Sequence, residues 1–255
     1  MMEEFFSLDA DGIALRGKIY AVENLPVSSP AVVILHGIPR SKPEPGDPGY
    51  APMAREFAQA GFQSLFLNFR GAGDSGGNFS ILGWTRDLNA AIDRLEQEYA
   101  PAGIALLGFS GGAAVAIHVA AHDPRVSAVV AASCPANFGA LGVSIKVEDW
   151  LRNFKEIGLI RDPGFPASVP DWLKEFEEVA PEKWVDKLSP RPILFIHGEK
   201  DELVPLEHAR LLFAKAGEPK EFFMVRDAPH RLRLSPVAIA KAKEWLLSWK
   251  QALPR

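Results

Sequence analysis

Continuous hydrophobic runs alternate with amphipathic stretches along most of this chain. The run Ala31–Leu35 contains only apolar residues, which suits a strand buried on both faces of a parallel sheet. The stretch Thr85–Tyr99 instead places Leu88, Ile92 and Leu95 along one helical face. This alternation predicts strands and helices that follow one another along the chain.

The predicted elements fall into two leading strands followed by repeated strand–helix units. The expected strands are Phe5–Leu8, Ile13–Val22, Ala31–Leu35, Phe62–Phe69, Ile104–Leu107, Val126–Ala132, Pro192–His197 and Glu221–Val225. The expected helices are Ala51–Ala60, Thr85–Tyr99, Ser110–His122, Leu206–Lys215 and Pro236–Gln251. Such an order predicts an α/β fold, with a mostly parallel central sheet and helices on both faces.

One segment, between Ser133 and Pro190, shows no strand pattern. Its short predicted helices are Val147–Ile157, Asp171–Val179 and Glu182–Leu188. Ser168 with Asp171 forms a candidate capping box for the second of them. The aromatic pairs of this segment, which would each share a helix face, are Trp150 with Phe154 and Trp172 with Phe176. They either attach the segment to the body or roof an apolar pocket, and both interpretations stay open.

Composition narrows the class of protein. With 255 residues, 47% of them hydrophobic, the chain suits one domain over residues 1–255 with a modest insertion. A net charge of −4 argues against a broad nucleic-acid-binding surface. The lone cysteine, Cys134, excludes an internal disulfide framework and a cysteine-rich zinc site, and we expect it to be a small buried side chain. No signal-peptide pattern and no apolar run of about 18 residues occurs, so a cytoplasmic location away from membranes is expected.

The segment Gly108-Phe109-Ser110-Gly111-Gly112 matches G-x-S-x-G, the nucleophile elbow. It follows a predicted strand and opens a predicted helix, which is the context that this motif requires. The residues two before and two after the serine must be small, because the turn is tight. The hydroxyl of Ser110 would then project above the sheet, where the helix N-terminus favours developing negative charge.

A serine nucleophile needs a base, and the chain has six histidines. His118 and His122 lie on the helix that follows Ser110 and point away from its reactive end, and His208 lies in a predicted surface helix. His36 and His197 each end a strand before a glycine, which is typical of structural loops. The sixth, His230, follows the eighth predicted strand at the carboxyl edge of the sheet, where Ser110 also lies. It is the predicted base.

The acid that would orient this base is expected after the preceding strand, in His197-Gly198-Glu199-Lys200-Asp201-Glu202. Glu199, Asp201 and Glu202 compete for the role. A solvated acidic loop is the simple interpretation of the two glutamates.

The whole chain resembles the α/β-hydrolase family, and within it the serine-esterase and serine-aminopeptidase-like branch. The segments that carry the resemblance are His36-Gly37, Asn68-Phe69-Arg70-Gly71-Ala72-Gly73-Asp74-Ser75, the elbow, His197-Gly198-Glu199-Lys200-Asp201 and Asp227-Ala228-Pro229-His230. They occur in the order that this family has. The resemblance favours Asp201 as the acid of a Ser-Asp-His triad. It also implies an oxyanion hole made by the backbone N–H groups of Ile38 and Gly111.

The family's lid corresponds to the insertion at about residues 134–187, and lids of this size occur in esterases that act on cinnamoyl and related aryl esters. Many relatives carry a longer polar residue after the serine, whereas this chain has Gly111. That departure puts the pocket in doubt rather than the nucleophile. The resemblance thus implies a serine carboxylic ester hydrolase with a small-molecule ester substrate and no cofactor or metal.

Several alternatives remain beside this interpretation. Gly71, Gly73 and Gly76 form a G-x-G-x-x-G, but it follows the fourth predicted strand and no helix begins directly after it, which argues against dinucleotide binding. A small peptidase or amidase would need acidic residues to hold a substrate ammonium. The candidates for this role are Glu148, Asp149, Glu175, Glu177 and Glu178. An acyltransferase shares every motif. A catalytically silent receptor of this fold usually lacks a member of the triad, and here all three residues are present. A homodimer stays open.

The cations near the predicted site raise the opposite idea of an anionic substrate. They are Arg40, Lys42, Arg231 and Arg233. Solvation at the surface is the simpler interpretation of these side chains.

Overall fold

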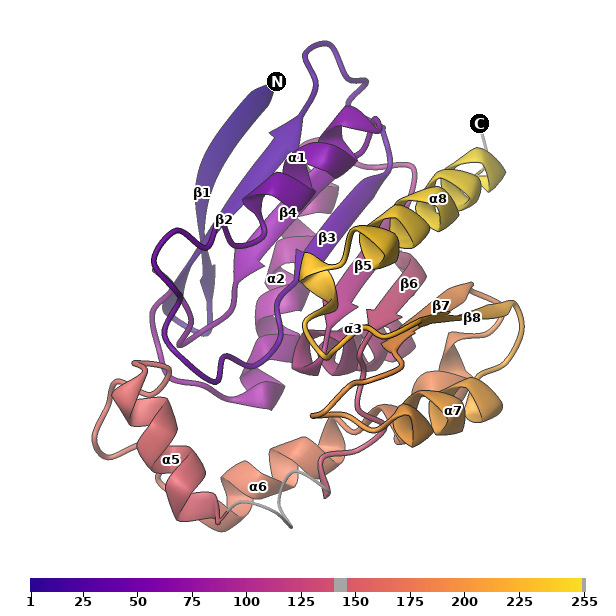
Figure 1. Ribbon diagram of the computed structural model, residues 1–255. Helices are drawn as coiled ribbons and strands as arrows, with labels where there is room; N and C mark the ends of the chain where they lie inside the picture. The colour runs from indigo at the N-terminus through magenta and orange to yellow at the C-terminus, as the bar shows by residue number, and fades with distance from the viewer. Residues whose placement is uncertain (140–145, 254–255) are drawn as a thin grey trace.

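An eight-stranded sheet crosses the molecule in the order β1-β2-β4-β3-β5-β6-β7-β8, as Figure 1 shows. This computed structural model describes residues 1–139 and 146–253. The strands are β1 (Met2–Ala10), β2 (Ile13–Ala21), β3 (Ala31–Leu35), β4 (Gln63–Asn68), β5 (Ile104–Phe109), β6 (Val126–Ala132), β7 (Ile193–Gly198) and β8 (Lys220–Val225). β1 and β2 pair antiparallel with their neighbours, and all other pairs are parallel. The predicted α/β fold is confirmed.

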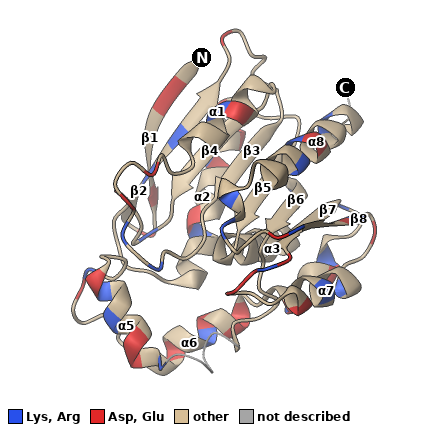
Figure 2. Cartoon of the chain, viewed as in Figure 1, with Lys and Arg blue, Asp and Glu red and all other residues tan. Residues whose placement is uncertain are grey.

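Helices cover both faces of this sheet and close two separate hydrophobic cores. The side chains of α2, α3 and α7 belong to one core, and those of α1 and α8 belong to the other. The helices are α1 (Ala51–Gln59), α2 (Ile81–Tyr99), α3 (Gly111–His122), α5 (Val147–Glu156), α6 (Val169–Glu178), α7 (Leu206–Lys215) and α8 (Pro236–Ala252). Short 3₁₀ helices are η1 (Pro181–Lys183), η2 (Val185–Leu188) and η3 (Leu232–Leu234). Strands β3, β5 and β6 carry no charged residue, as expected of strands buried on both faces (Figure 2).

Helix α2 begins at Ile81, four residues before the predicted start at Thr85. The hydroxyl of Ser80 caps it by accepting a hydrogen bond from the Gly83 N–H at 2.8 Å. Apolar periodicity did not reveal this first turn, because its start is set by a cap rather than by the pattern. At α6 the predicted cap is found, since the Ser168 hydroxyl accepts from the Asp171 N–H at 3.3 Å.

The helical segment, which we define as residues 146–188, lies between β6 and β7 and contains no strand. Residues 140–145, within the predicted insertion, lie outside the described residues. Phe154, Trp172 and Phe176 are buried and pack edge-on around Phe79 at centroid distances of 5.1–6.1 Å. The Trp172 indole N–H also donates to the Phe79 carbonyl at 3.1 Å. These three aromatics therefore attach the segment to the body, whereas Trp150 is half-buried.

Candidate active site

Ser110 stands in the turn between β5 and α3, with φ 52° and ψ −122°. This backbone conformation is rare for a residue with a side chain and marks a strained turn. The flanking glycines are needed for packing: a Cβ on Gly108 would lie 2.5 Å from the Ala113 Cα, and one on Gly112 would lie 2.4 Å from the His36 carbonyl oxygen. The predicted strand–turn–helix context of the elbow is therefore present, with its serine half-buried.

The segment after β3 packs against this turn. A Cβ placed on Gly37 would lie 3.0 Å from the Ser110 Cβ, and one placed on Gly111 would lie 3.5 Å from the Ile38 amide nitrogen. The structure therefore brings the two predicted oxyanion donors, Ile38 and Gly111, next to each other beside Ser110. The Cγ1 of Ile38 lies only 2.7 Å from the Gly111 Cβ position, which explains why no longer residue follows the serine.

His36 fixes the peptide that carries one of these donors. Its Nε2 accepts from the Phe69 N–H at 3.1 Å, so Nδ1 carries the proton and donates to the Gly37 carbonyl at 2.8 Å. That carbonyl and the Ile38 N–H belong to one planar peptide unit, and the bond therefore orients the N–H as well. Burial lowers the pKa of His36 to about 4, which keeps the ring neutral. The structural role predicted for His36 is confirmed.

Asp201 and His230 lie together at the carboxyl edge of the sheet. The Nδ1 of His230 is 2.9 Å and 2.8 Å from the two carboxylate oxygens of Asp201, whose side chain is fully buried. Burial opposes ionisation of this carboxyl, but hydrogen bonds from His230 and from the N–H groups of Leu203 and Val204 outweigh it and lower its pKa. Asp201 is thus an ionised carboxylate bound to the imidazole of His230.

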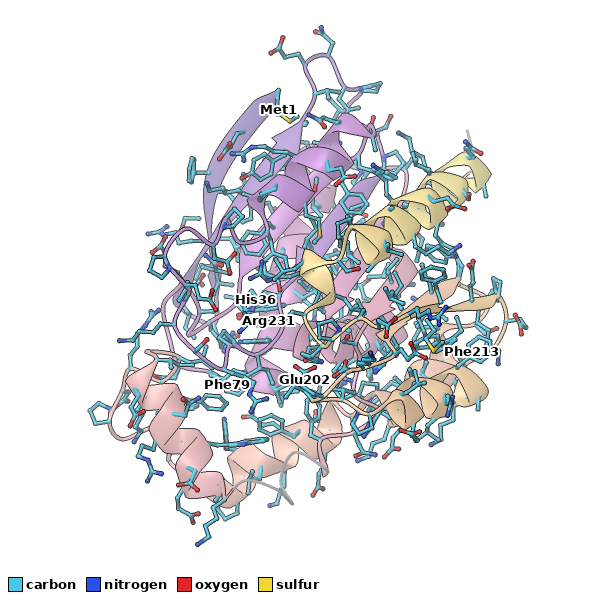
Figure 3. The ribbon with its side chains drawn as sticks, viewed as in Figure 1. Met1, His36, Phe79, Glu202, Phe213 and Arg231 are labelled. Atoms are coloured by element: carbon cyan, nitrogen blue, oxygen red, sulfur yellow. The ribbon has the colours of Figure 1, made fainter. Side chains whose placement is uncertain are left out.

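A short chain of contacts links Ser110 to His230. The Ser110 N–H donates to the Ala132 carbonyl at 2.8 Å, and the hydroxyl of the next residue, Ser133, donates to the His230 carbonyl at 3.1 Å. The ends of β5 and β6 and the loop after β8 therefore meet at one edge. In Figure 3, the neighbouring Glu202 and Arg231 lie on the side of the sheet where α5 and α6 are found.

The two glutamates that competed with Asp201 are exposed, as expected, but they are more than a solvated face. Glu199 accepts the Asp227 N–H at 3.0 Å, and Glu202 accepts the His230 N–H at 3.1 Å. Neither takes the ring proton of His230, so the structure separates their role from that of Asp201.

The other histidines make structural contacts. The buried His197 lies with Nε2 2.8 Å from the Val204 carbonyl and 3.5 Å from Asp201. His208 is half-buried rather than on an exposed surface, and its Nδ1 accepts the Ala136 N–H at 3.0 Å. His118 and His122 pack on Trp184, on the far part of α3. Within residues 1–139 and 146–253 no cluster of metal-ligating side chains occurs, and Cys134 is buried as predicted.

The loop with Gly71, Gly73 and Gly76, which matches a dinucleotide-binding motif, presents its carbonyl oxygens to an arginine. The guanidinium of Arg161 donates to the carbonyls of Ser75, Gly73 and Gly71 at 2.5, 2.8 and 3.3 Å. A phosphate needs N–H donors instead. The loop therefore binds the part of the helical segment that lies between α5 and α6.

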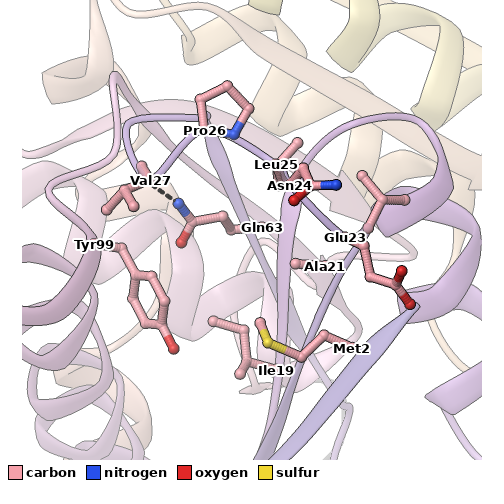
Figure 4. Close-up of a pocket in the computed structure, with 11 residues that line it drawn as sticks. Met2, Ile19, Ala21, Glu23, Asn24, Leu25, Pro26, Val27, Gln63 and Tyr99 are labelled. Atoms are coloured by element: carbon pink, nitrogen blue, oxygen red, sulfur yellow. Dashed lines mark hydrogen bonds between the residues drawn. The ribbon is translucent and has the colours of Figure 1, made fainter.

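Elsewhere, a hollow lies at the amino ends of β3 and β4, lined by residues that include Gln63 and Tyr99 (Figure 4). It is at the opposite end of the sheet from Ser110 and offers no serine or histidine among its lining residues.

The charged side chains near the site are largely paired with the protein itself. Glu175, one of the half-buried candidates for holding a substrate ammonium, accepts the Ser80 hydroxyl at 2.7 Å. Arg233 pairs with Asp47, and Arg231 lies 3.6 Å from Glu44. Glu175, Arg231 and Arg233 therefore each have a partner within the described residues.

Comparison with known proteins agrees with this geometry. Residues 28–158, just over half of the chain, match the family described as serine aminopeptidase, S33. The protein YfhR of Escherichia coli is 24% identical over 228 residues, which cover 86% of this chain and 70% of YfhR.

Solved structures show the same fold. The esterase Pf2001 of Pyrococcus furiosus has a TM-score of 0.70 at 23% identity, covering 98% of this chain and 93% of its own. Est1E of Butyrivibrio proteoclasticus, solved with ferulic acid bound, has a TM-score of 0.72 at 19% identity, covering 97% and 98%. With its mostly parallel sheet and its elbow, the chain belongs to the serine aminopeptidase S33 family of the α/β-hydrolase superfamily, a family of hydrolases.

Proposed function

We propose that this protein is a serine carboxylic ester hydrolase that works through Ser110, His230 and Asp201. The observation that carries the proposal is the buried Asp201 carboxylate bound to the His230 Nδ1 at 2.8 Å, at the edge of the sheet where the elbow presents Ser110. A hydrolase of this superfamily needs a nucleophile, a base and an orienting acid at one place, and these three side chains supply them.

The chemistry follows from these roles. His230 Nε2 takes the proton of the Ser110 hydroxyl as its oxygen attacks the ester carbonyl carbon. The carbonyl oxygen becomes an oxyanion that accepts hydrogen bonds from the N–H groups of Ile38 and Gly111. The C–O bond to the alcohol breaks, and His230 gives its proton to the leaving oxygen. Water, deprotonated by His230, then cleaves the acyl-enzyme and releases the acid and free Ser110.

Short-chain and aryl esters, including cinnamoyl-like ones, are the proposed substrates. Ferulic acid is bound in the solved structure of Est1E, which shares this fold. The helical segment is proposed to act as the lid over the acyl group, because Asn153 of α5 donates to the Arg40 carbonyl, two residues from the oxyanion donor Ile38. Trp150, half-buried on the same helix, is available to contact an aromatic acyl group.

The family description favours a second candidate, an aminopeptidase or amidase. The bond between Glu175 and Ser80 weighs against it, because this carboxylate already has a protein partner. An acyltransferase would use the same acyl-enzyme and differ only in the acceptor.

The test is hydrolysis of p-nitrophenyl esters of increasing acyl length and of cinnamoyl esters, with Ser110→Ala and His230→Ala beside the wild type. We expect activity that both variants lose by orders of magnitude, while His208→Ala, which changes a structural histidine, stays close to the wild type. Ester turnover that survives in Ser110→Ala would overturn the proposal. Labelling of Ser110 by a fluorophosphonate without ester turnover would favour amides or acyl transfer.

A further inference from the structure

The residue proposed as the base is held through its backbone as well as through its ring. His230 lies in the loop between β8 and η3, and in the described residues β8 is an edge strand whose neighbour is β7. Regular sheet pairing therefore does not fix this loop. Three side chains from two other strand ends bind His230 itself: Asp201 at the imidazole, Glu202 at the N–H and Ser133 at the carbonyl.

Glu202 supplies the first backbone contact. Its Oε2 accepts the His230 N–H at 3.1 Å, from the same loop that carries Asp201. Hydrogen bonds to a carboxylate are stronger than those between neutral groups. Among the residues that the structure describes, Glu202 forms no ion pair, so its carboxylate is available for His230.

Ser133 supplies the second contact, from directly after β6. Its hydroxyl donates to the His230 carbonyl at 3.1 Å, and its own N–H donates to the Ile196 carbonyl at 2.9 Å. The side chain is 1% exposed, and its φ of 48° is in the left-handed region. A residue with a side chain rarely adopts this conformation. In this conformation the Ser133 hydroxyl points at the His230 carbonyl.

We propose that Glu202 and Ser133 are positioning residues for His230. By holding its N–H and its carbonyl from two sides, they keep the imidazole on Asp201 and its Nε2 toward Ser110 during both proton transfers. The inference rests on the proposed function, in which His230 is the base. Both residues bind the backbone of His230, so their proposed contribution comes through the placement of the ring.

Matched variants separate this role from a general structural one. Glu202→Ala and Ser133→Ala each remove one contact. Glu199→Ala is the control on the same loop, because Glu199 binds the Asp227 N–H instead, and Ser127→Ala is the control on β6, where the hydroxyl donates to the Ile104 carbonyl at 3.2 Å. For each variant we would measure kcat and KM on a p-nitrophenyl ester, the rate at which a fluorophosphonate labels Ser110, and the thermal midpoint.

We expect kcat and the labelling rate to fall about tenfold or more in Glu202→Ala and Ser133→Ala, with KM unchanged, because a misplaced base slows only the proton transfers. Glu202→Gln keeps an acceptor oxygen and should recover most of the rate. The inference is wrong if Glu202→Ala and Ser133→Ala match their controls, or if Glu202→Gln is as slow as Glu202→Ala. Because Glu202 is exposed, its variants give the result even where Ser133→Ala lowers the thermal midpoint.

An NMR measurement tests the same point without a substrate. The Nδ1 proton of His230, identified by its loss in His230→Gln, should exchange with water faster in Glu202→Ala than in the wild type and in Glu199→Ala. Equal exchange in all three proteins would overturn the positioning role. Failure of the proposed function appears differently, as a wild type without turnover or as turnover that persists in Ser110→Ala.

Discussion

At the scale of single residues, reactivity at Ser110 is coupled to a strained backbone. A residue with a side chain at φ 52° and ψ −122° costs about 1–3 kcal/mol, which the surrounding packing must offset. The close contacts of Gly108 and Gly112 hold the turn in this form. The serine, the proposed nucleophile, is therefore expected to lower the stability of the fold.

Glycine at this position should release the strain. Compared with Ser110→Ala, Ser110→Gly is expected to raise the free energy of unfolding by about 1 kcal/mol, since both variants lose the hydroxyl but only glycine adopts this conformation freely. Urea denaturation of the two inactive variants measures the difference. Equal midpoints and slopes would show that the turn stores no such energy.

At the scale of elements, one arginine between α5 and α6 attaches the helical segment to the loop after β4. Besides the carbonyls that its guanidinium binds, the Arg161 N–H donates to the Asn78 side chain at 2.7 Å. The Gly71–Gly77 loop directly follows Arg70. The guanidinium of Arg70 pairs with the buried Asp87 at 2.7 Å. The segment is thus joined to the body by polar contacts here and by the aromatics around Phe79 further along.

Removing this arginine should loosen the segment. Arg161→Ala leaves several carbonyls without their donor, so we expect a loss of about 1.5–3 kcal/mol in the free energy of unfolding and faster cleavage within α5 and α6 by limited proteolysis. Arg152→Ala is the control, because Arg152 pairs only with Asp149 of the same helix in the described residues. Equal cleavage rates in both variants would contradict the role of Arg161.

At the scale of the whole molecule, the buried His36 and the half-buried His118 make stability depend on pH. Burial lowers the pKa of both His36 and His118 to about 4, whereas an unfolded chain takes up these protons near 6.5. Between these values the unfolded state binds more protons than the folded state. The free energy of unfolding therefore falls as the pH decreases from about 6.5 towards 4.

The slope of this dependence measures the contribution of each histidine. A fully shifted histidine contributes about 1.4 kcal/mol per pH unit, and His36→Asn should lower the slope of the wild type by about that amount. Urea denaturation at several pH values between 4 and 6.5 gives the comparison, with the exposed His122→Asn as the control. A His36→Asn slope equal to that of the wild type would show that this ring is protonated in the folded protein.

Local patterns predicted most of the architecture, because strands such as Ala31–Leu35 and helices such as Leu206–Lys215 are set by nearby residues. The nucleophile elbow was also readable, since its small residues are adjacent in sequence. Contacts between distant residues were not: Ser133 and His230 are 97 positions apart, and Ser80 and Glu175 are 95 apart. No periodicity marks a side chain that binds a carbonyl so far along the chain.

The same reason explains the sequence interpretation of the acidic loop. Asp201 and Glu202 are adjacent and chemically alike, so only the resemblance to a family distinguished them. The structure separates them by burial, because the Asp201 side chain is fully buried and Glu202 is exposed. Packing therefore determines that Asp201 binds the His230 ring and that Glu202 binds its backbone N–H. The sequence alone does not show this packing.

The proposed nucleophile and its proposed base follow strands that differ in their pairing within the sheet. Ser110 follows β5, which is paired on both sides, whereas His230 follows the edge strand β8. Local opening takes the least-paired strands first, so a fluctuation that detaches β8 would remove the base while the elbow stays folded. On heating, activity would then be lost before the core unfolds. On cooling, activity would return without complete refolding. The temperature at which activity is lost is therefore expected to depend on the pairing of β8 with β7.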